Sequence, residues 1–373
     1  MTDEKSVKRI KIPVWLIFTL SAVALSAALN LLARLCGGFG ELYAQYVYPA
    51  FVCTIGFISG LFPFSVGEWL LYILIGAVIF GTVYNTVRFV RGKGRRRKIL
   101  LRVTAWVLCG ASALYLVFTL LCGINYTRTA FSEKSGLIVE KYTAQDLADL
   151  CVYLVINANE SAEQISCGEN GLVSLDGIDI TGECVNAMQS LGEQYPELSG
   201  FYPRAKAVAF SEGMSYCKIL GIYIPFTIEA NYNTNAPYFS IPFTVCHELS
   251  HLKGFMREDE AGFIAYLACR DSDIPELRYS AYTEALIYAL NAFYPVAGDE
   301  LYAELLSYIH PRVRAEISAN SRYWSRYETP VSEVSSAIND GYLKVQGQSD
   351  GKKSYGRFVD LMIYDYKQQS TEG

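Results

Sequence analysis

Residues 243–263 read FTVCHELSHLKGFMREDEAGF, and within them His247, Glu248 and His251 form an HExxH pattern. The whole chain holds only three histidines, so two of them stand in this one pattern. Residues four apart on an α-helix share a face, so both imidazoles can reach one metal ion at about 2.0–2.1 Å. Glu248 lies beside them, where a carboxylate can polarise a bound water. The stretch therefore predicts a helix that carries a zinc centre, set in a mainly helical domain.

The residues that follow predict where this helix ends and where a third ligand lies. Gly254 supplies a stop, and a second helix can begin at once with acidic residues. The segment EDEAG, 258–262, fits a form in which a ligand glutamate is followed three and four residues later by Ala and by a small or amide residue, which favours Glu258. Glu260 is the competitor, because it points about 160° away on a helix and only one of the two can face the metal.

Two further positions bear on this centre. Gly262 stands where an Asn or Asp that orients a ligand histidine often sits, so that support is missing here. His310, the third histidine, precedes Pro311 and is interpreted as a surface or capping residue, with an oxyanion donor or a distant ligand as the alternative.

The first 124 residues hold apolar runs that are long enough to cross a bilayer, and we predict three spans at about 13–35, 70–90 and 99–124. A further run, 47–69, is broken by prolines and glycines and is predicted to be interfacial or re-entrant. If it crossed, the basic loop 91–98 would face outward, against the positive-inside tendency. The first run is too long for a signal peptide and is predicted to be an uncleaved anchor.

The net charge of the chain changes sign at the same position, after residue 124. Residues 1–124 carry 13 Lys and Arg against 4 Asp and Glu, a net +9, whereas the remainder carries 19 against 33, a net −14. Basic residues before the first span predict a cytoplasmic N-terminus, and three spans then place 125–373 outside the membrane. The acidic balance of that part argues against a nucleic-acid partner.

The part from 125 to 373 is predicted to be one mainly helical domain with a small sheet. Apolar spacing of three and four predicts helices at 143–166, 181–195, 258–270, 278–295, 299–308, 311–325, 330–340 and 355–367. Alternating segments at 205–210 and 219–233 predict strands, and PFTIEANYN, 225–233, is expected to be an edge strand that can pair with an extended peptide. Cysteines of this part are compatible equally with disulfides or with free buried thiols, namely Cys151, Cys167, Cys184 and Cys217.

The run GIYIPFTIEAN, 221–231, leads into CHELSHLKGFMREDEAGFIAYLAC, 246–269, and YLKVQGQSDGKKSYGRFVDL follows at 342–361. With the preceding spans, these segments resemble a bacterial membrane family known as domain of unknown function 3810. Members of that family usually have Asn where this chain has Gly262. The chain also looks similar to the zincin metallopeptidases that use a glutamate as third ligand, which implies metal ligation by His247 and His251 and a general-base role for Glu248.

The expected fold is thus three transmembrane α-helices followed by a mainly α (α+β), zincin-like extracytoplasmic domain. The expected function is a membrane-anchored, Zn2+-dependent metallopeptidase that hydrolyses peptide bonds outside the cytoplasmic membrane. Its expected partners are the lipid bilayer and a peptide or protein substrate of the cell envelope. The alternative is a non-catalytic zinc-binding sensor or envelope assembly protein, which a closed site of four protein ligands would favour. A hydrolase of another amide or ester bond is a third interpretation.

Overall fold

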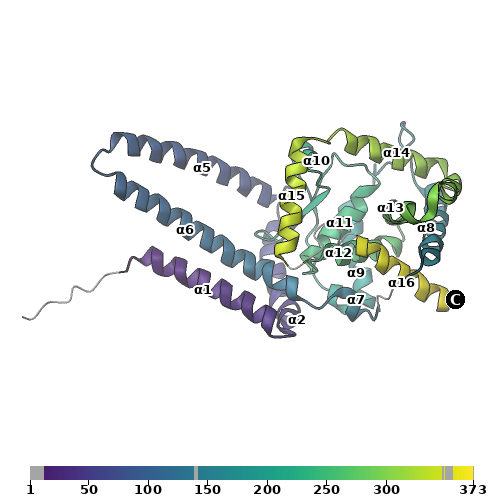
Figure 1. Cartoon of the computed structure of the whole chain (residues 1–373), viewed down its shortest axis with the longest axis horizontal. Helices are drawn as coiled ribbons and strands as arrows, with labels where there is room; N and C mark the ends of the chain where they lie inside the picture. Colours follow the sequence, from purple (N-terminus) through teal and green to yellow (C-terminus); the bar gives the residue numbers. More distant parts are fainter. Residues whose placement is uncertain (1–11, 138–141, 347, 349–355, 373) are drawn as a thin grey trace, which may run out of the picture.

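Long apolar helices extend from one end of the molecule in the computed structural model, which describes residues 12–137, 142–346, 348 and 356–372 (Figure 1). They are α1 (Val14–Leu35), α5 (Val66–Arg91) and α6 (Arg96–Leu121). Most of their apolar side chains are exposed, as expected of helices whose solvent is lipid. The three predicted runs are therefore confirmed as long apolar helices, and the protein has the features of a membrane protein.

A fourth apolar segment complicates the number of spans. Among the described residues, four helices are long and apolar enough to cross a membrane, and the fourth is Phe39–Gly60. It is a continuous series of short helical pieces with two π turns: α2 (Phe39–Leu42), η1 (Tyr43–Val47), α3 (Tyr48–Phe51), η2 (Val52–Gly56) and α4 (Phe57–Gly60). Length and composition do not separate this segment from the other three, so a total of three spans stays a prediction.

The contacts of α1 and α6 show how the long helices are arranged. Thr19 lies 3.5 Å from the Cys109 sulfur, and the Asn30 amide donates to Thr119 at 3.2 Å. The earlier residue of α1 contacts the earlier residue of α6, and the later residue contacts the later one, so α1 and α6 run parallel. The loop 92–95 between α5 and α6 therefore lies at the end of the bundle where α1 begins, away from the C-terminal part (Figure 1).

The segment Phe39–Gly60 stays close to the C-terminal part along its length. Near its start the Tyr43 hydroxyl donates to the Leu120 carbonyl at 2.7 Å, at the end of α6. In the middle the Tyr48 hydroxyl donates to the Leu252 carbonyl at 3.1 Å. At its end the Ser59 carbonyl accepts from the Lys206 ammonium group. Both ends of the segment thus lie at the same end of the bundle.

Within the described residues, a small sheet has the strand order β1-β3-β2. β1 (Lys206–Ala207) is parallel to β3 (Glu229–Tyr232), and β2 (Gly221–Ile224) is antiparallel to it. The prediction of one strand over 219–233 is wrong, because 225–228 forms a turn in which Ile228 has φ 51°. The prediction of an edge strand at 225–233 is also wrong: β3 is central, and β2 is at the edge.

The sheet is fixed to the start of α5 by a buried carboxylate. Glu229 accepts hydrogen bonds from the amides of Val66 and Gly67, at 3.0 and 2.7 Å. These amides have no partner within their own helix, and the positive end of the helix dipole favours an anion there. Glu68, in the same turn, accepts from the Phe210 amide at 2.9 Å. The sheet and the α5 terminus therefore form one hydrogen-bonded unit.

Helices make up most of the remainder, close to their predicted ranges. They are η3 (Gly123–Thr127), α7 (Phe131–Lys134), α8 (Ala144–Gln164), α9 (Ile180–Gln194), η4 (Pro196–Leu198), α10 (Ser211–Tyr216), α11 (Ser240–Leu252), α12 (Glu258–Arg270), α13 (Pro275–Ser307), α14 (Pro311–Ser325), α15 (Pro330–Val345) and α16 (Gly356–Glu372). Thr143 caps α8 as predicted, with Asp146 completing a capping box. Gly298, at φ 74°, breaks α13 between the two helices predicted there. α11 lies in the middle, against α9, α12, α13 and the sheet.

All ten cysteines lie in the described part of the chain, and none forms a disulfide. Cys151, Cys184, Cys246 and Cys269 are fully buried among helices. The alternative of free buried thiols therefore holds for Cys151 and Cys184, whereas Cys217 is free but half-buried and Cys167 is free and exposed.

Candidate metal centre

The motif helix α11 ends at a turn that brings the chain directly back to its histidines. Gly254 has φ 91°, a conformation that glycine adopts without a side-chain clash. Its amide donates to the His251 carbonyl at 2.9 Å, and the Phe255 amide donates to Ser250 at 3.2 Å, as in the common helix-ending motif. α12 begins four residues after Gly254. The predicted stop therefore places the start of α12 beside the end of α11.

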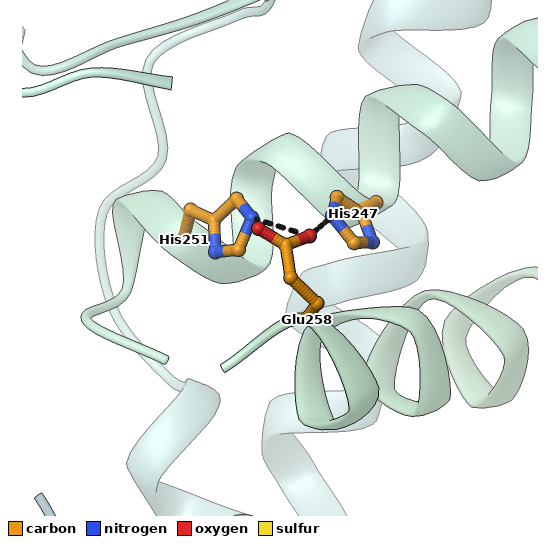
Figure 2. A group of neighbouring side chains, drawn as sticks. All are labelled: His247, His251 and Glu258. Carbon is orange, nitrogen blue, oxygen red and sulfur yellow. Dashed lines mark hydrogen bonds and ion pairs between the residues drawn. The ribbon is translucent and has the colours of Figure 1, made fainter. Parts of the chain in front are cut away.

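Glu258 lies between the two histidines of the motif (Figure 2). One of its carboxylate oxygens is 3.2 Å from His247 Nε2 and 3.7 Å from His251 Nε2. Zinc bound tetrahedrally at 2.0–2.1 Å needs ligand atoms about 3.3–3.4 Å apart. Within the part of the chain that the structure describes, these are the three His, Cys, Asp or Glu side chains whose donor atoms converge, within 4.8 Å of one another. The two separations from Glu258 are close to those that a zinc ion requires.

The orientation of His251 is set by a backbone carbonyl. His251 Nδ1 donates to the Phe255 carbonyl at 2.7 Å, across the turn that follows α11. This bond leaves Nε2 directed at Glu258. A ligand histidine in proteins is commonly oriented by such a bond from its other nitrogen. The turn therefore positions both the ligand helix and the imidazole.

Burial and the ligand carboxylate act in opposite directions on these groups. Burial lowers the pKa of His247. Burial would also lower the pKa of His251, but the hydrogen bond and charge of Glu258 raise it to about 9. Burial raises the pKa of Glu258, but hydrogen bonds from both histidines outweigh this effect and hold the pKa well below its usual value. The ionised Glu258 thus favours a positive charge beside it, either a proton on His251 or a metal ion in its place.

Glu248 is buried beside the triad but is not part of it. Burial raises its pKa to about 8, and its Oε2 atom has no hydrogen-bond partner among the described residues. Strand β2 passes directly over it: a Cβ atom on Gly221 would lie 2.6 Å from Glu248 Oε1. A glycine at this point of β2 is what leaves room for the carboxylate. A buried carboxylate that has one oxygen without a partner and lies next to a polar triad is a candidate proton acceptor.

Glu260 turns to the other side of α12. Its two oxygens accept from the Ser132 amide at 2.9 Å and the Ser132 hydroxyl at 2.8 Å, at the start of α7. Of the two alternatives left open by the sequence, Glu258 is the carboxylate that meets the histidines. Glu260 instead connects α12 to the segment that follows α6.

A family profile described as "Protein of unknown function (DUF3810)" matches residues 43–363. The match covers more than half of the chain, from the segment before α5 to α16. The chain belongs to the DUF3810 family. No curated protein and no solved structure matches it. Family membership thus establishes the kinship of this chain, whereas the chemistry of its site is inferred from its own residues.

In this DUF3810 protein, Gly262 lies beside His247, one of the two candidate ligand histidines. A Cβ atom there would be 4.0 Å from His247 Nδ1 and 3.7 Å from the ring of Phe358. An asparagine at this position could therefore reach the imidazole, but glycine provides no polar group. His310 lies elsewhere: it begins α14, where its Nδ1 accepts from the Arg312 amide at 3.2 Å. Its interpretation as a capping residue agrees with this contact.

The residues that bind the turn 253–257 from the side of the long apolar helices were not predicted from the sequence. Arg128 Nη1 donates to the Lys253 carbonyl at 2.8 Å, and its guanidinium lies 3.7 Å from the centre of the Phe255 ring. Tyr48 contributes its bond to Leu252 and a second one, at 2.7 Å, to Tyr223 of β2. The only local signal was that Arg128 follows closely on a predicted span.

Part of the polar segment 342–361 also comes near the centre. The Tyr126 hydroxyl donates to the Tyr342 hydroxyl at 3.0 Å. Burial raises the pKa of both tyrosines. Arg357 donates to Asp259 at 2.8 Å. Ser354 and Tyr355 of the same polar segment lie outside the described residues.

Proposed function

We propose that this protein is a membrane-anchored zinc metallopeptidase. The observation that carries the proposal is the convergence of His247, His251 and Glu258, at separations that suit a zinc ion, beside the buried Glu248. Three protein ligands leave a fourth tetrahedral position for water or substrate, as in catalytic rather than structural zinc sites. Peptide bonds are the substrates that this ligand set most commonly serves.

The chain's own residues would divide the work as follows. His247, His251 and Glu258 hold the metal, and the Phe255 carbonyl keeps His251 in the required orientation. A zinc ion held there lowers the pKa of water and polarises a carbonyl group. Glu248, buried beside the three ligands, would accept a proton and return it to the leaving amine. The edge strand β2 lies over Glu248 and, among the described residues, pairs with β3 alone, so its other edge is proposed to pair with an extended peptide.

The proposal includes three spans with the C-terminal part outside. Supporting it, the segment Phe39–Gly60 begins and ends at the same end of the bundle, through Tyr43 and Ser59. The basic residues of 91–98 lie at the opposite end, where the positive-inside tendency places the cytoplasm. A reporter fused to the C-terminus should be active only outside the cytoplasm, and one active inside would reverse the orientation.

The test of function compares the full-length protein with Glu248→Gln, both purified into lipid nanodiscs. We expect about one zinc per chain in both, because Glu248 is not a ligand, when metal is measured by mass spectrometry. We expect cleavage of a peptide library by the parent only. A parent without metal would refute the proposal. If both bind zinc and neither cleaves peptides, the non-catalytic sensor becomes the better interpretation.

A further inference from the structure

Helix α15 has an apolar face that the described part of the chain leaves uncovered. Val331, Val334, Ile338 and Val345 are 53, 60, 68 and 72% exposed, and Tyr342, on the same face, is 38% exposed. At about 100° per residue, the five side chains fall within a stripe roughly 80° wide. Isolated exposed apolar residues are ordinary, but a continuous stripe along four turns of a helix marks a contact surface.

The other two faces of α15 have different partners. One packs on the body of the protein: Leu343 is fully buried, and the Ser335 hydroxyl donates to the Cys217 carbonyl at 3.0 Å. The face opposite the stripe carries charged residues, including Glu333 and Lys344. A helix with one apolar face, one charged face and no great overall hydrophobicity is the type that lies along a membrane surface.

The position of α15 agrees with such a role. Figure 1 shows it running across the direction of α5 and α6, at the end where these helices meet the rest of the protein. The Tyr342 ring makes an edge contact with Phe118 of α6, with centroids 6.4 Å apart. Phe118 is three residues before the end of α6. The C-terminal part of α15 is therefore level with the last turn of a helix that is apolar and long enough to cross the bilayer.

A cavity at this place gives a second, independent indication. It has a volume of about 320 Å³ and lies between the end of α15 and the ends of α1 and α6. Val345 and Gln346 line one side; the other sides are lined by Ala27, Asn30, Leu31, Arg34, Tyr115, Phe118 and Thr119. Its walls are more apolar than polar, and its polar groups include Arg34 at the last turn of α1. An acyl chain with a polar head matches this lining.

From these observations we infer that α15 lies in the surface of the bilayer, with Val331, Val334, Ile338 and Val345 among the lipid chains. The occupant of the stripe is lipid, because the stripe is continuous with the outer ends of α1 and α6 and ends at the cavity between them. The inference does not depend on whether the metal centre is catalytic. It adds a membrane contact that is separate from the spans themselves.

The contact has a consequence for the metal centre. Tyr342 belongs to the lipid-facing stripe, and its hydroxyl lies 4.0 Å from the Cys122 sulfur. The Cys122 sulfur lies 3.7 Å from the sulfur of Met256, two residues before Glu258. The path from the stripe to the turn before Glu258 thus passes through Cys122 and Met256. If the proposed peptidase function holds, the substrate is a polypeptide bound at the membrane surface.

The experiment places a photoactivatable benzoylphenylalanine at single positions of the full-length protein in nanodiscs that contain a lipid with a clickable acyl chain. Ile338 tests the stripe, Glu333 is the matched control on the charged face of α15, and Leu74, exposed on α5, is the positive control. We expect lipid adducts at Ile338 that match those at Leu74, and none at Glu333. All three sites are exposed, so folding should tolerate the substitution.

Two results would overturn the inference. One is the absence of lipid adducts at Ile338 when Leu74 gives them. The other is a cross-link from Ile338 to a second copy of the chain, which would make the stripe a dimer interface. Neither readout requires metal or turnover, so failure of the peptidase proposal would be seen separately, in the Glu248→Gln comparison.

Discussion

Two carboxylates at the start of α12, those of Glu258 and Glu260, are only two residues apart, yet they contact different regions of the molecule. Glu258 faces α11 and meets His247 and His251, whereas Glu260 faces α7 and binds the backbone and hydroxyl of Ser132. Both are ionisable, and Glu260 is buried whereas Glu258 is partly buried, so composition alone does not distinguish them. What distinguishes them is the partner: imidazoles that can share a cation on one side, and neutral donors on the other. The comparison shows that one helix can complete a candidate metal site on one side and be attached, on the other side, to the segment that follows α6.

The largest expected effect is on zinc affinity, which should fall when Glu258 is substituted and change little when Glu260 is. Glu258→Gln should weaken zinc binding by at least about a hundredfold, because losing a ligand costs more than losing its supporting partner. Glu260→Gln should change the affinity by less than about threefold, since its partners are neutral donors far from the histidines. Titration with a competing chelator measures both. Equal losses in the two variants would contradict the distinction between the two sides of α12.

A third carboxylate, that of the buried Glu316, makes the stability of the protein depend on pH. Burial raises the pKa of Glu316 to about 7, from the ordinary 4.5, while it accepts a hydrogen bond from the Val173 amide. Between these two values the folded state holds a proton that the unfolded state has lost, so stability falls as pH rises through this window and is level above it. Glu316→Gln keeps an acceptor and removes the titration, and should raise stability at pH 8 by up to about 3 kcal/mol.

Thermal unfolding of parent and variant at pH 5 and pH 8 measures this effect. Glu333→Gln, at an exposed position of α15, serves as the control and should leave the pH dependence of the parent unchanged. The same pH dependence in Glu316→Gln as in the parent would mean that Glu316 does not stay buried and protonated.

A smaller effect on the free energy of unfolding is expected on the side of α12 that carries Glu260 and faces α7. Glu260→Ala leaves the Ser132 amide and hydroxyl without their acceptor, which should cost about 1–3 kcal/mol of unfolding free energy. Ser132→Ala removes only the hydroxyl bond and should cost less. Chemical denaturation of both variants, with the double variant to complete the cycle, gives the coupling energy. A coupling near zero would show that this side of α12 is not stabilised through Ser132.

The smallest expected effect is on zinc affinity when Gly262 is substituted. Gly262 lies one turn after Glu258, on the side of α12 that faces His247. Gly262→Asn places an amide next to His247 Nδ1 and should tighten zinc binding by up to about tenfold, as supporting partners of ligand histidines do. Gly262→Ala is the control: its Cβ meets only ordinary contacts, and it should leave affinity unchanged. If Ala tightens binding as much as Asn, helix stiffening rather than orientation of His247 is responsible.

Sequence patterns predicted those parts of the site that lie close together along the chain. HExxH depends on helix periodicity and the stop at Gly254 on the conformation of glycine, whereas Glu258 was favoured over Glu260 because EDEAG fits a known form of ligand glutamate. The limits of α12 and α14 followed from the same periodicity and from Pro311. Ligation itself, the active-site chemistry and the topology remain predictions.

The parts that could not be predicted depend on contacts between distant residues. The turn at 225–228 lies within a segment rich in β-branched and aromatic residues, and only pairing with β1 and β2 decides that β3 is central. Tyr48 is 204 residues from its acceptor Leu252, and Arg128 is 125 residues from Lys253. No spacing rule links such pairs. The placement of α15 is of the same kind, because an apolar stripe indicates a contact but does not tell what it contacts.

The carboxylate that caps α5 has a consequence for the order of biogenesis. Val66 and its acceptor Glu229 are 163 residues apart. At about 5–20 residues per second, a ribosome takes roughly 8–30 s to cover that distance, so α5 can enter the bilayer well before its cap exists. During this interval the Val66 and Gly67 amides must bind water or lipid headgroups, because unpaired amides are not tolerated among acyl chains. The start of α5 is therefore expected to emerge at the bilayer surface, and the last-made part of the sheet completes one of the first-made helices.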